Sequence, residues 1–295
     1  MATARELHGR VAPLYALLNA ERYFLRAASE GKLAKQMFAY KATSIAIEHD
    51  RVVCGLANKA ANTHKAIGVL CDAELADDSY ALCRVLMENA VVFCWLCRGD
   101  WPDRIERYVM SRAPNQKRLA EVIQDHVPGT SDAIEAAESW SRRPTLVAVS
   151  DALNDEYLKW AVFPDPARPG KLKTYSLKDM LAEMDDGKVQ PKSGHFAYAL
   201  QYFDTSQFVH STPTGLRNIE TETHGERTYH VAERARRELR DLALVTSSVW
   251  MLVTLASLAD FLGHHKLREQ VDELVEAVKG YDREHAAGTS EAVPV

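Results

Sequence analysis

The sequence predicts an all-α protein: a helical bundle of long helices with one irregular insertion. Three observations support this fold class. Apolar residues recur with helical spacing along most of the chain. Alternating patterns of the kind that form strands are almost absent. Proline and glycine residues concentrate in one stretch, residues 141–194, which we interpret as an insertion or lid between two halves of the bundle.

Composition is that of a soluble globular protein with a sizeable core. The chain has 295 residues, 46% of them hydrophobic, and a formal net charge of -5. We expect one bundle domain over residues 1–284 and a disordered tail over residues 285–295. The mild negative charge argues against nucleic-acid binding through bulk charge, although a local basic patch remains open.

Three helices are predicted in the first third of the chain. The first covers residues 4–29, and Pro13 either kinks it or marks its true start. The second covers residues 33–70 and is rich in alanine, a strong helix former. The third covers residues 78–97. Its apolar positions extend over most of its circumference, so it is predicted to be a core helix, with Gly99 at its end.

Short helical segments are predicted through the middle of the chain. A helix over residues 103–126 precedes the insertion, and within the insertion helices are plausible over residues 146–159 and 177–184. The run Ser176–Asp179 resembles an N-terminal capping box in which aspartate replaces glutamate.

The C-terminal third is predicted as three helices and one loop. A helix over residues 195–211 is followed by a loop over residues 212–228. A long helix follows over residues 229–262. Gly263 separates it from a last amphipathic helix over residues 265–278.

One uncharged stretch, residues 242–259, is long enough to span a bilayer. It contains several serine and threonine residues and continues directly from a charged run, so we interpret it as a buried core helix and expect no membrane association. The five cysteines lie in the first third of the chain, and two of them form the pair Cys94-Trp-Leu-Cys97. We interpret them as buried free thiols, which favours a cytoplasmic location.

A row of polar side chains is the first candidate site. Tyr202, Ser206 and His210 are spaced four apart, so on a helix they share one face. Pro213 follows shortly after and is expected to end the helix. A phenol, a hydroxyl and an imidazole would then lie together near a helix C-terminus.

The second candidate is the pair Arg84 and Glu88, spaced i,i+4 on the predicted core helix. Its neighbours are almost all apolar, and a charged pair in such surroundings must find partners or lose several kcal/mol, roughly, to desolvation. The polar row around Ser206 could supply those partners. A structural polar network and a functional site both remain open.

Two segments, ALCRVLMENAVVFCWL and YFDTSQFVHSTPTG, resemble the signatures of an uncharacterised family of bacterial all-helical proteins, known only as a domain of unknown function. The resemblance covers mainly residues 40–110 and 195–260. It implies a bundle in which five residues converge: Arg84, Glu88, Tyr202, Ser206 and His210.

The chain is also distantly similar to the HEPN superfamily of helical ribonucleases and nucleotide-binding proteins, which carry an Arg-x(4–6)-His motif. Here no arginine precedes His210 at that spacing, so Arg84 would have to replace it from another helix. This resemblance implies RNA or nucleotide binding, a metal-independent ribonuclease in stress or phage defence, and a homodimer.

In such an enzyme His210 would act as general acid or base on a ribose 2′-hydroxyl, and Arg84 would stabilise the charge on the phosphorus. Tyr202 and Ser206 would position the phosphate, and Glu88 would orient Arg84 or His210. The alternative is a non-catalytic module that binds a protein partner and whose polar cluster is structural.

An arginine-rich run after the polar row could form a basic patch, or it could be a solvated helix face paired with glutamates. Its members are Arg217, Arg227, Arg234, Arg236, Arg237 and Arg240. The chain has no Glu-x-x-His pair of the kind that binds metal in helical bundles, no P-loop and no dinucleotide-binding turn, so neither a metal nor a cofactor is expected.

Overall fold

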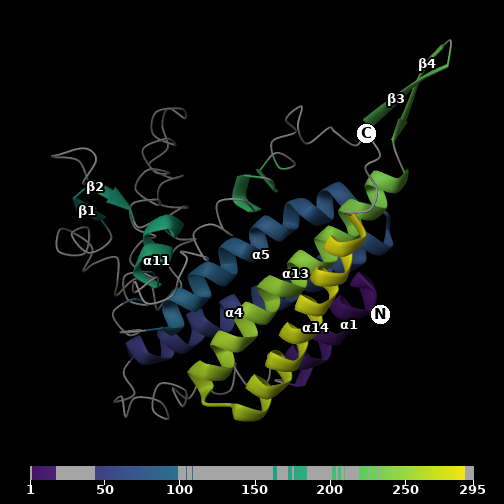
Figure 1. The fold of residues 1–295 in the computed structure, drawn as a ribbon. Coiled ribbons are helices and arrows are strands. Elements are labelled where there is room, and N and C mark those ends of the chain that lie inside the picture. The colour runs from purple at the N-terminus through teal and green to yellow at the C-terminus, as the bar shows by residue number, and fades with distance from the viewer. Residues whose placement is uncertain are drawn as a thin grey trace.

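A computed structural model of the chain describes residues 2–17, 44–98, 104, 108, 162–164, 172–174, 176–184, 201–203, 205, 206, 209, 219–224, 226–231 and 233–289. Its body is a bundle of long helices packed side by side (Figure 1). These helices are α1 (Ala4–Leu17), α4 (Ser44–Asp72), α5 (Ala76–Cys97), α13 (Glu233–Leu262) and α14 (His265–Thr289). The predicted all-α fold class is confirmed.

Helix α13 is the centre of the bundle, because it packs against α5, α4, α1 and α14. Its sequence explains this position, since apolar and small residues surround it on nearly all sides. A large core cluster joins these five helices, with Leu86, Leu244 and Val271 among its fully buried members. A second cluster, around Phe93 and Trp95, joins α4, α5 and α13 to the short helix α11 (Leu177–Met184).

Two helices, Ala76–Cys97 and residues 236–262, are long and apolar enough to cross a membrane by length and composition. Most of each apolar window is buried inside the bundle, 61% and 72% respectively. This burial is what a central helix of a packed core shows. It agrees with the interpretation of residues 242–259 as part of a buried helix.

Two small antiparallel hairpins lie outside the packed helices. Strand β1 (Val162–Pro164) pairs with β2 (Leu172–Thr174) inside the predicted insertion, in the register Val162↔Thr174. Strand β3 (Ile219–His224) pairs with β4 (Glu226–Val231), in the register Ile219↔Val231, and projects from one end of the bundle (Figure 1).

The second hairpin corrects the sequence prediction of a loop over residues 212–228 followed directly by a helix. Strand β4 extends to Val231, and α13 starts only at Glu233. The strands are short and rich in threonine, which favours extended backbone. Their glutamates favour helix, so local preference does not predict the hairpin.

Several helix ends also differ from the prediction: α4 ends at Asp72 instead of residue 70, and α5 starts at Ala76 instead of residue 78. Helix α14 continues to Thr289, so residues 285–289 of the predicted disordered tail are helical, and residues 290–295 lie outside the described part of the chain. The two alanines in this stretch, Ala286 and Ala287, favour helix. Helix α11 has the predicted bounds. The helices predicted over residues 103–126 and 146–159 fall almost wholly outside the described residues.

Hydrogen bonds close the turn between α13 and α14. Gly263 adopts a left-handed φ of 63°, which glycine accepts without steric cost. Its N–H donates to the carbonyl of Asp260 at 3.2 Å, and the N–H of His264 donates to that of Ala259 at 2.8 Å. These bonds satisfy carbonyls that the helix end leaves free. The predicted break at Gly263 is confirmed.

The N-termini of two helices carry capping boxes. The Ser176 hydroxyl accepts from the Asp179 N–H at 3.3 Å, while the Asp179 carboxylate accepts from the Ser176 N–H at 2.9 Å, which confirms the prediction for α11. At α1, Thr3 and Glu6 make the same reciprocal bonds, at 3.2 and 2.7 Å. The second box follows the Thr-x-x-Glu pattern and could have been predicted.

Candidate functional site

The candidate site starts from a charged residue on the core helix α5. Arg84 and Glu88 are one helical turn apart, and the Arg84 Nε donates to Glu88 Oε1 at 2.9 Å. The side chains are 18% and 34% exposed, so the pair lies at the edge of the bundle and not in its dry centre. A pair at this depth contributes about 1 kcal/mol or less to stability.

Arg84 also reaches the polar row predicted from the sequence. Its Nη2 donates to the Tyr202 hydroxyl at 2.8 Å, and its Nη1 donates to the Ser206 hydroxyl at 3.4 Å. The guanidinium carbon lies 4.1 Å from the centre of the Tyr202 ring, a cation–π distance. Tyr202 and Ser206 are both helical, so their four-residue spacing turns both toward α5.

A second set of contacts holds the 201–206 segment on the bundle. The Trp250 indole N–H on α13 donates to the Gln201 side-chain oxygen. Thr205 is fully buried, and its hydroxyl donates to the Gln201 carbonyl at 2.6 Å. The segment is therefore attached to α13 through Gln201 and to α5 through Tyr202 and Ser206. Sequence reasoning missed Gln201 and Trp250, because spacing along one helix carries no information about the other.

The structure thus brings together four of the five predicted site residues. Arg84, Glu88, Tyr202 and Ser206, called the Arg84 cluster below, are in mutual contact through the arginine. His210 lies outside the described residues, and its place beside the cluster stays a prediction. Within the described ranges, no group of three or more His, Cys, Asp or Glu residues is arranged to hold a metal ion.

Comparison with protein families gives a match over residues 50–227, to a family of unknown function, DUF5677. The chain belongs to the DUF5677 family. The matched segment contains all five predicted site residues and the whole predicted insertion, and it ends before α13. No curated protein and no solved structure matches the chain.

The electrostatics of the cluster in this DUF5677 protein depend on the Arg84–Glu88 pair. The carboxylate offsets the guanidinium charge, and the phenol and hydroxyl offer neutral oxygens to its remaining edge. A guanidinium held in one plane presents a fork that matches carboxylate or phosphate. The longest contact, to Ser206, is the one that an incoming anion would replace at least cost.

The arginine-rich run is only partly described in this DUF5677 chain. Arg236 and Arg237 are exposed in the first turns of α13. Arg240 pairs with Asp241 at 3.4 Å, so its charge is partly neutralised. The side chains of the other three members, Arg217, Arg227 and Arg234, are outside the described set.

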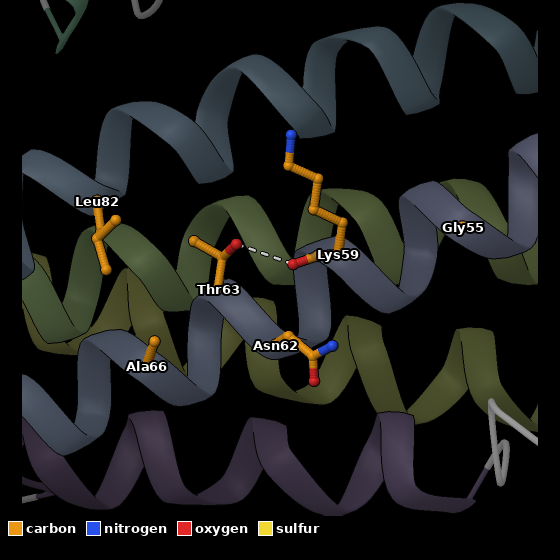
Figure 2. A pocket seen from close by; sticks show the side chains of 6 residues that line it. All are labelled: Gly55, Lys59, Asn62, Thr63, Ala66 and Leu82. Carbon is orange, nitrogen blue, oxygen red and sulfur yellow. Dashed lines mark hydrogen bonds between the residues drawn. The ribbon is translucent and has the colours of Figure 1, made fainter. Parts of the chain in front are cut away.

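A shallow pocket of about 470 Å³ lies between α4 and α5 (Figure 2). Its lining consists of Gly55, Lys59, Asn62, Thr63, Ala66 and Leu82. Figure 2 shows the Lys59 amine extended toward α5, and the Thr63 hydroxyl donates to the Lys59 carbonyl at 2.8 Å. The lining has no carboxylate or imidazole, so it offers no acid–base group near neutral pH. The Arg84 cluster is therefore the better candidate site in this DUF5677 chain.

Proposed function

We propose that the Arg84 cluster recognises phosphate, and that this chain is a HEPN-like helical protein of the cytoplasm that binds RNA or a nucleotide. We further propose that it cleaves RNA without a metal, in bacterial stress or phage defence. One observation is the main support for phosphate recognition. A partly exposed guanidinium is held in a fixed orientation by side chains from its own helix and from the 201–206 segment.

A fixed arginine suits phosphate recognition. Glu88 holds Nε, and the Tyr202 ring lies against the guanidinium, so little side-chain entropy remains to be lost when an anion binds. A phosphate oxygen would take the place of Ser206 at Nη1, and the freed hydroxyl would donate to the same phosphate.

An exposed aromatic ring beside the cluster favours a nucleotide over a simple anion. Phe203 directly follows Tyr202 and is 68% exposed. Proteins that read single-stranded RNA stack unpaired bases on such rings, which stabilises binding by about 1–3 kcal/mol per base. Phosphate at Arg84 and a base on Phe203 together favour a single-stranded nucleotide as the ligand.

In the proposed reaction His210 removes the proton from a ribose 2′-hydroxyl, and the 2′-oxygen attacks the adjacent phosphorus. The bond from phosphorus to the 5′-oxygen breaks, and that oxygen takes a proton from water or from the protonated His210. The products are a 2′,3′-cyclic phosphate and a 5′-hydroxyl. Arg84 stabilises the extra negative charge on the phosphoryl oxygens in the transition state.

The test is incubation of the purified protein with mixed transfer and messenger RNA in EDTA. Cleavage should occur with the native protein and be lost in His210→Ala and Arg84→Ala. His265→Ala is the matched control, because His265 is exposed at the start of α14. Absence of cleavage and of RNA binding by the native protein would refute the proposal, and so would equal cleavage by all variants.

A second candidate function is a non-catalytic module that forms a homodimer or binds another protein through its helices. An exposed apolar stripe on α13 favours it. Leu242, Val249 and Val253 are 45%, 36% and 36% exposed, and the partly exposed Thr246 and Ala256 continue the stripe. Their alternating spacing of four and three residues matches the seam of a coiled coil.

Light scattering of the native protein and of the double variant Val249→Glu, Val253→Glu tests this candidate. A dimer that becomes a folded monomer in the variant would support it. A native protein that is monomeric and captures no helical partner through this stripe would exclude it. The melting temperature of Arg84→Ala also tests whether the Arg84 cluster binds phosphate or is purely structural. A purely structural cluster requires this substitution to lower the melting temperature.

A further inference from the structure

Two histidines from different helices stack in the interior of the bundle. His8 on α1 and His64 on α4 have ring centroids 3.8 Å apart and an interplanar angle of 7°. Both are buried, at 5% and 0% exposure. Nothing in the proposed function uses them.

Hydrogen bonds hold both rings in place. His8 Nε2 lies 3.1 Å from the His64 carbonyl, which can only accept, so His8 carries its hydrogen on Nε2. His64 Nδ1 is 3.3 Å from the Tyr15 hydroxyl, with the Tyr15 ring edge-on to the imidazole. His64 Nε2 is buried with no hydrogen-bond partner among the described residues.

Besides the burial that lowers the pKa of His8, Arg5 lowers it, whereas Asp72 and the hydrogen bond to the His64 carbonyl raise it. Arg5 and Asp72 act on His8 from the ends of α1 and α4, and they are paired with each other. Among the residues that the structure describes, the charge that acts on the pKa of His64 is that of His8, which lowers it. The hydrophobic residues that α13 and α14 contribute to this core include the partly buried Trp250 and Tyr281, and α13 also carries the buried hydroxyls of Ser247, Ser248 and Thr254.

Backbone packing makes the contact tight. A Cβ added at Gly68 would lie 2.7 Å from His8 Cε1, so α1 can approach α4 this closely only because position 68 is glycine. Helix α1 is held on α13, α14 and α4 by Leu7, Val11 and Leu14, and its release would expose these residues.

We propose that the stacked His8–His64 pair is an acid-sensitive latch, which holds α1 on the bundle while both rings are neutral and releases it when they take up protons. The proposal goes beyond the proposed function and is independent of it.

The direction of the pH effect on α1 follows from the burial of both imidazoles. Desolvation lowers the pKa of His8 from its usual 6.5 to about 4 and that of His64 to about 2. Both groups therefore hold α1 in place above pH 6.5. Their contribution to the stability of docked α1 is lost as the pH falls from 6.5 toward 4, because the two imidazoles bind protons when α1 is released and not while it is docked. From pH 7 to pH 5 the released fraction should rise about 20-fold for each ring that reaches water, and roughly 400-fold for two.

Hydrogen exchange read by mass spectrometry tests the latch on the full chain at pH 7, 6 and 5, after correction for the intrinsic pH dependence of exchange. Opening of α1 should rise by the stated factors while α5 stays protected. His8→Gln keeps a donor for the His64 carbonyl and should remove about 20-fold of the rise. His265→Gln, at an exposed site, should behave as the native protein does.

Two results would overturn the proposal. One is an α1 protection that does not change with pH. The other is an equal pH response in His8→Gln and in the native protein. If His8→Gln is too unstable at pH 7, Tyr15→Phe serves as a second variant. It keeps both imidazoles and should therefore retain the pH response.

Discussion

At the scale of single residues, removing the charge of Glu88 tests whether the Arg84 cluster is a binding site or only a packing contact. In Glu88→Gln the amide oxygen can still accept from Arg84 Nε, while the competing negative charge is gone. If the Arg84 cluster binds phosphate, the affinity for a short single-stranded RNA should rise several-fold, and stability should fall by about 1 kcal/mol or less because the pair is partly exposed.

Fluorescence anisotropy with a labelled oligonucleotide measures this effect. The matched control is Asp272→Asn, which neutralises the partner of Arg268 on α14 in the same i,i+4 geometry. An equal gain in both variants would indicate a general charge effect and not a site at Arg84.

The sequence predicts which of these residues share a helix face, but it does not predict which other helix they contact. The i,i+4 rule places Arg84 beside Glu88 and puts Tyr202 and Ser206 on one face, and both pairings are seen. Contact between the two pairs was suggested by the need of a charged pair in apolar surroundings for partners, and it was implied by the resemblance. The Trp250–Gln201 bond could not be predicted, since periodicity fixes which face of a helix is buried and not which helix covers it.

At the scale of elements, the close approach of α1 to α4 depends on Gly68. In Gly68→Ala the new methyl group would meet His8 Cε1 at 2.7 Å and Arg5 Nη1 at 3.1 Å. The His8 ring is fixed by its stack on His64 and cannot turn aside. We expect a loss of about 1–3 kcal/mol in the free energy of unfolding, measured by urea denaturation.

Gly55 on the same helix is the control for this substitution. Nothing lies within 4 Å of a Cβ added there, so Gly55→Ala should stabilise the protein by about 0.5–1 kcal/mol through helix propensity. A similar effect at both positions would show that the α1–α4 contact is looser than its geometry indicates.

Helix α11 depends on its cap and on the polar contacts that Glu183 makes with Trp95 and Arg104. Ser176→Ala removes the hydroxyl that accepts from the Asp179 N–H and should cost about 1 kcal/mol. The Trp95 indole N–H donates to Glu183 at 2.7 Å and ties α11 to α5. In Ser176→Ala we expect faster hydrogen exchange in α11 and unchanged exchange in α4 and α13. Thr3→Ala should act in the same way on α1 alone.

At this scale the helices with strong apolar periodicity were predicted and the β3–β4 hairpin was not. The bounds of α11 and the break at Gly263 followed from capping and glycine signals. The strand sequences IETETH and ERTYHV mix β-favouring threonine with helix-favouring glutamate, so local preference alone does not decide their conformation.

At the scale of the whole molecule, buried thiols report on global unfolding. Burial raises the pKa of Cys71, Cys83 and Cys94, and all three are reduced and buried. Thiols of this kind react slowly, because reaction requires both solvent access and the thiolate. In the native protein their labelling by a disulfide reagent should follow the global unfolding rate and accelerate sharply in denaturant. Fast labelling of these residues at pH 8 would contradict the packed core.

The packed core extends beyond the segment that defines the family. Residues 50–227 include most of α4 and all of α5, while the core cluster that covers them also requires α1, α13 and α14. A fragment of residues 50–227 should therefore expose a large apolar surface and lack cooperative unfolding by circular dichroism. The full chain is the reference, and a fragment that unfolds cooperatively would show that the remaining helices are accessory.

The β3–β4 ribbon has a consequence for solubility. Among the described residues each strand pairs only with the other, so two outer strand edges present backbone N–H and C=O groups to any further strand that approaches. Its sequence contains Glu220, Glu222, Glu226 and Arg227, and charges at such edges discourage sheet growth between molecules. The charges in this sequence are therefore expected to keep ribbons of different molecules apart, and aggregation at high salt is expected to begin at this end of the bundle.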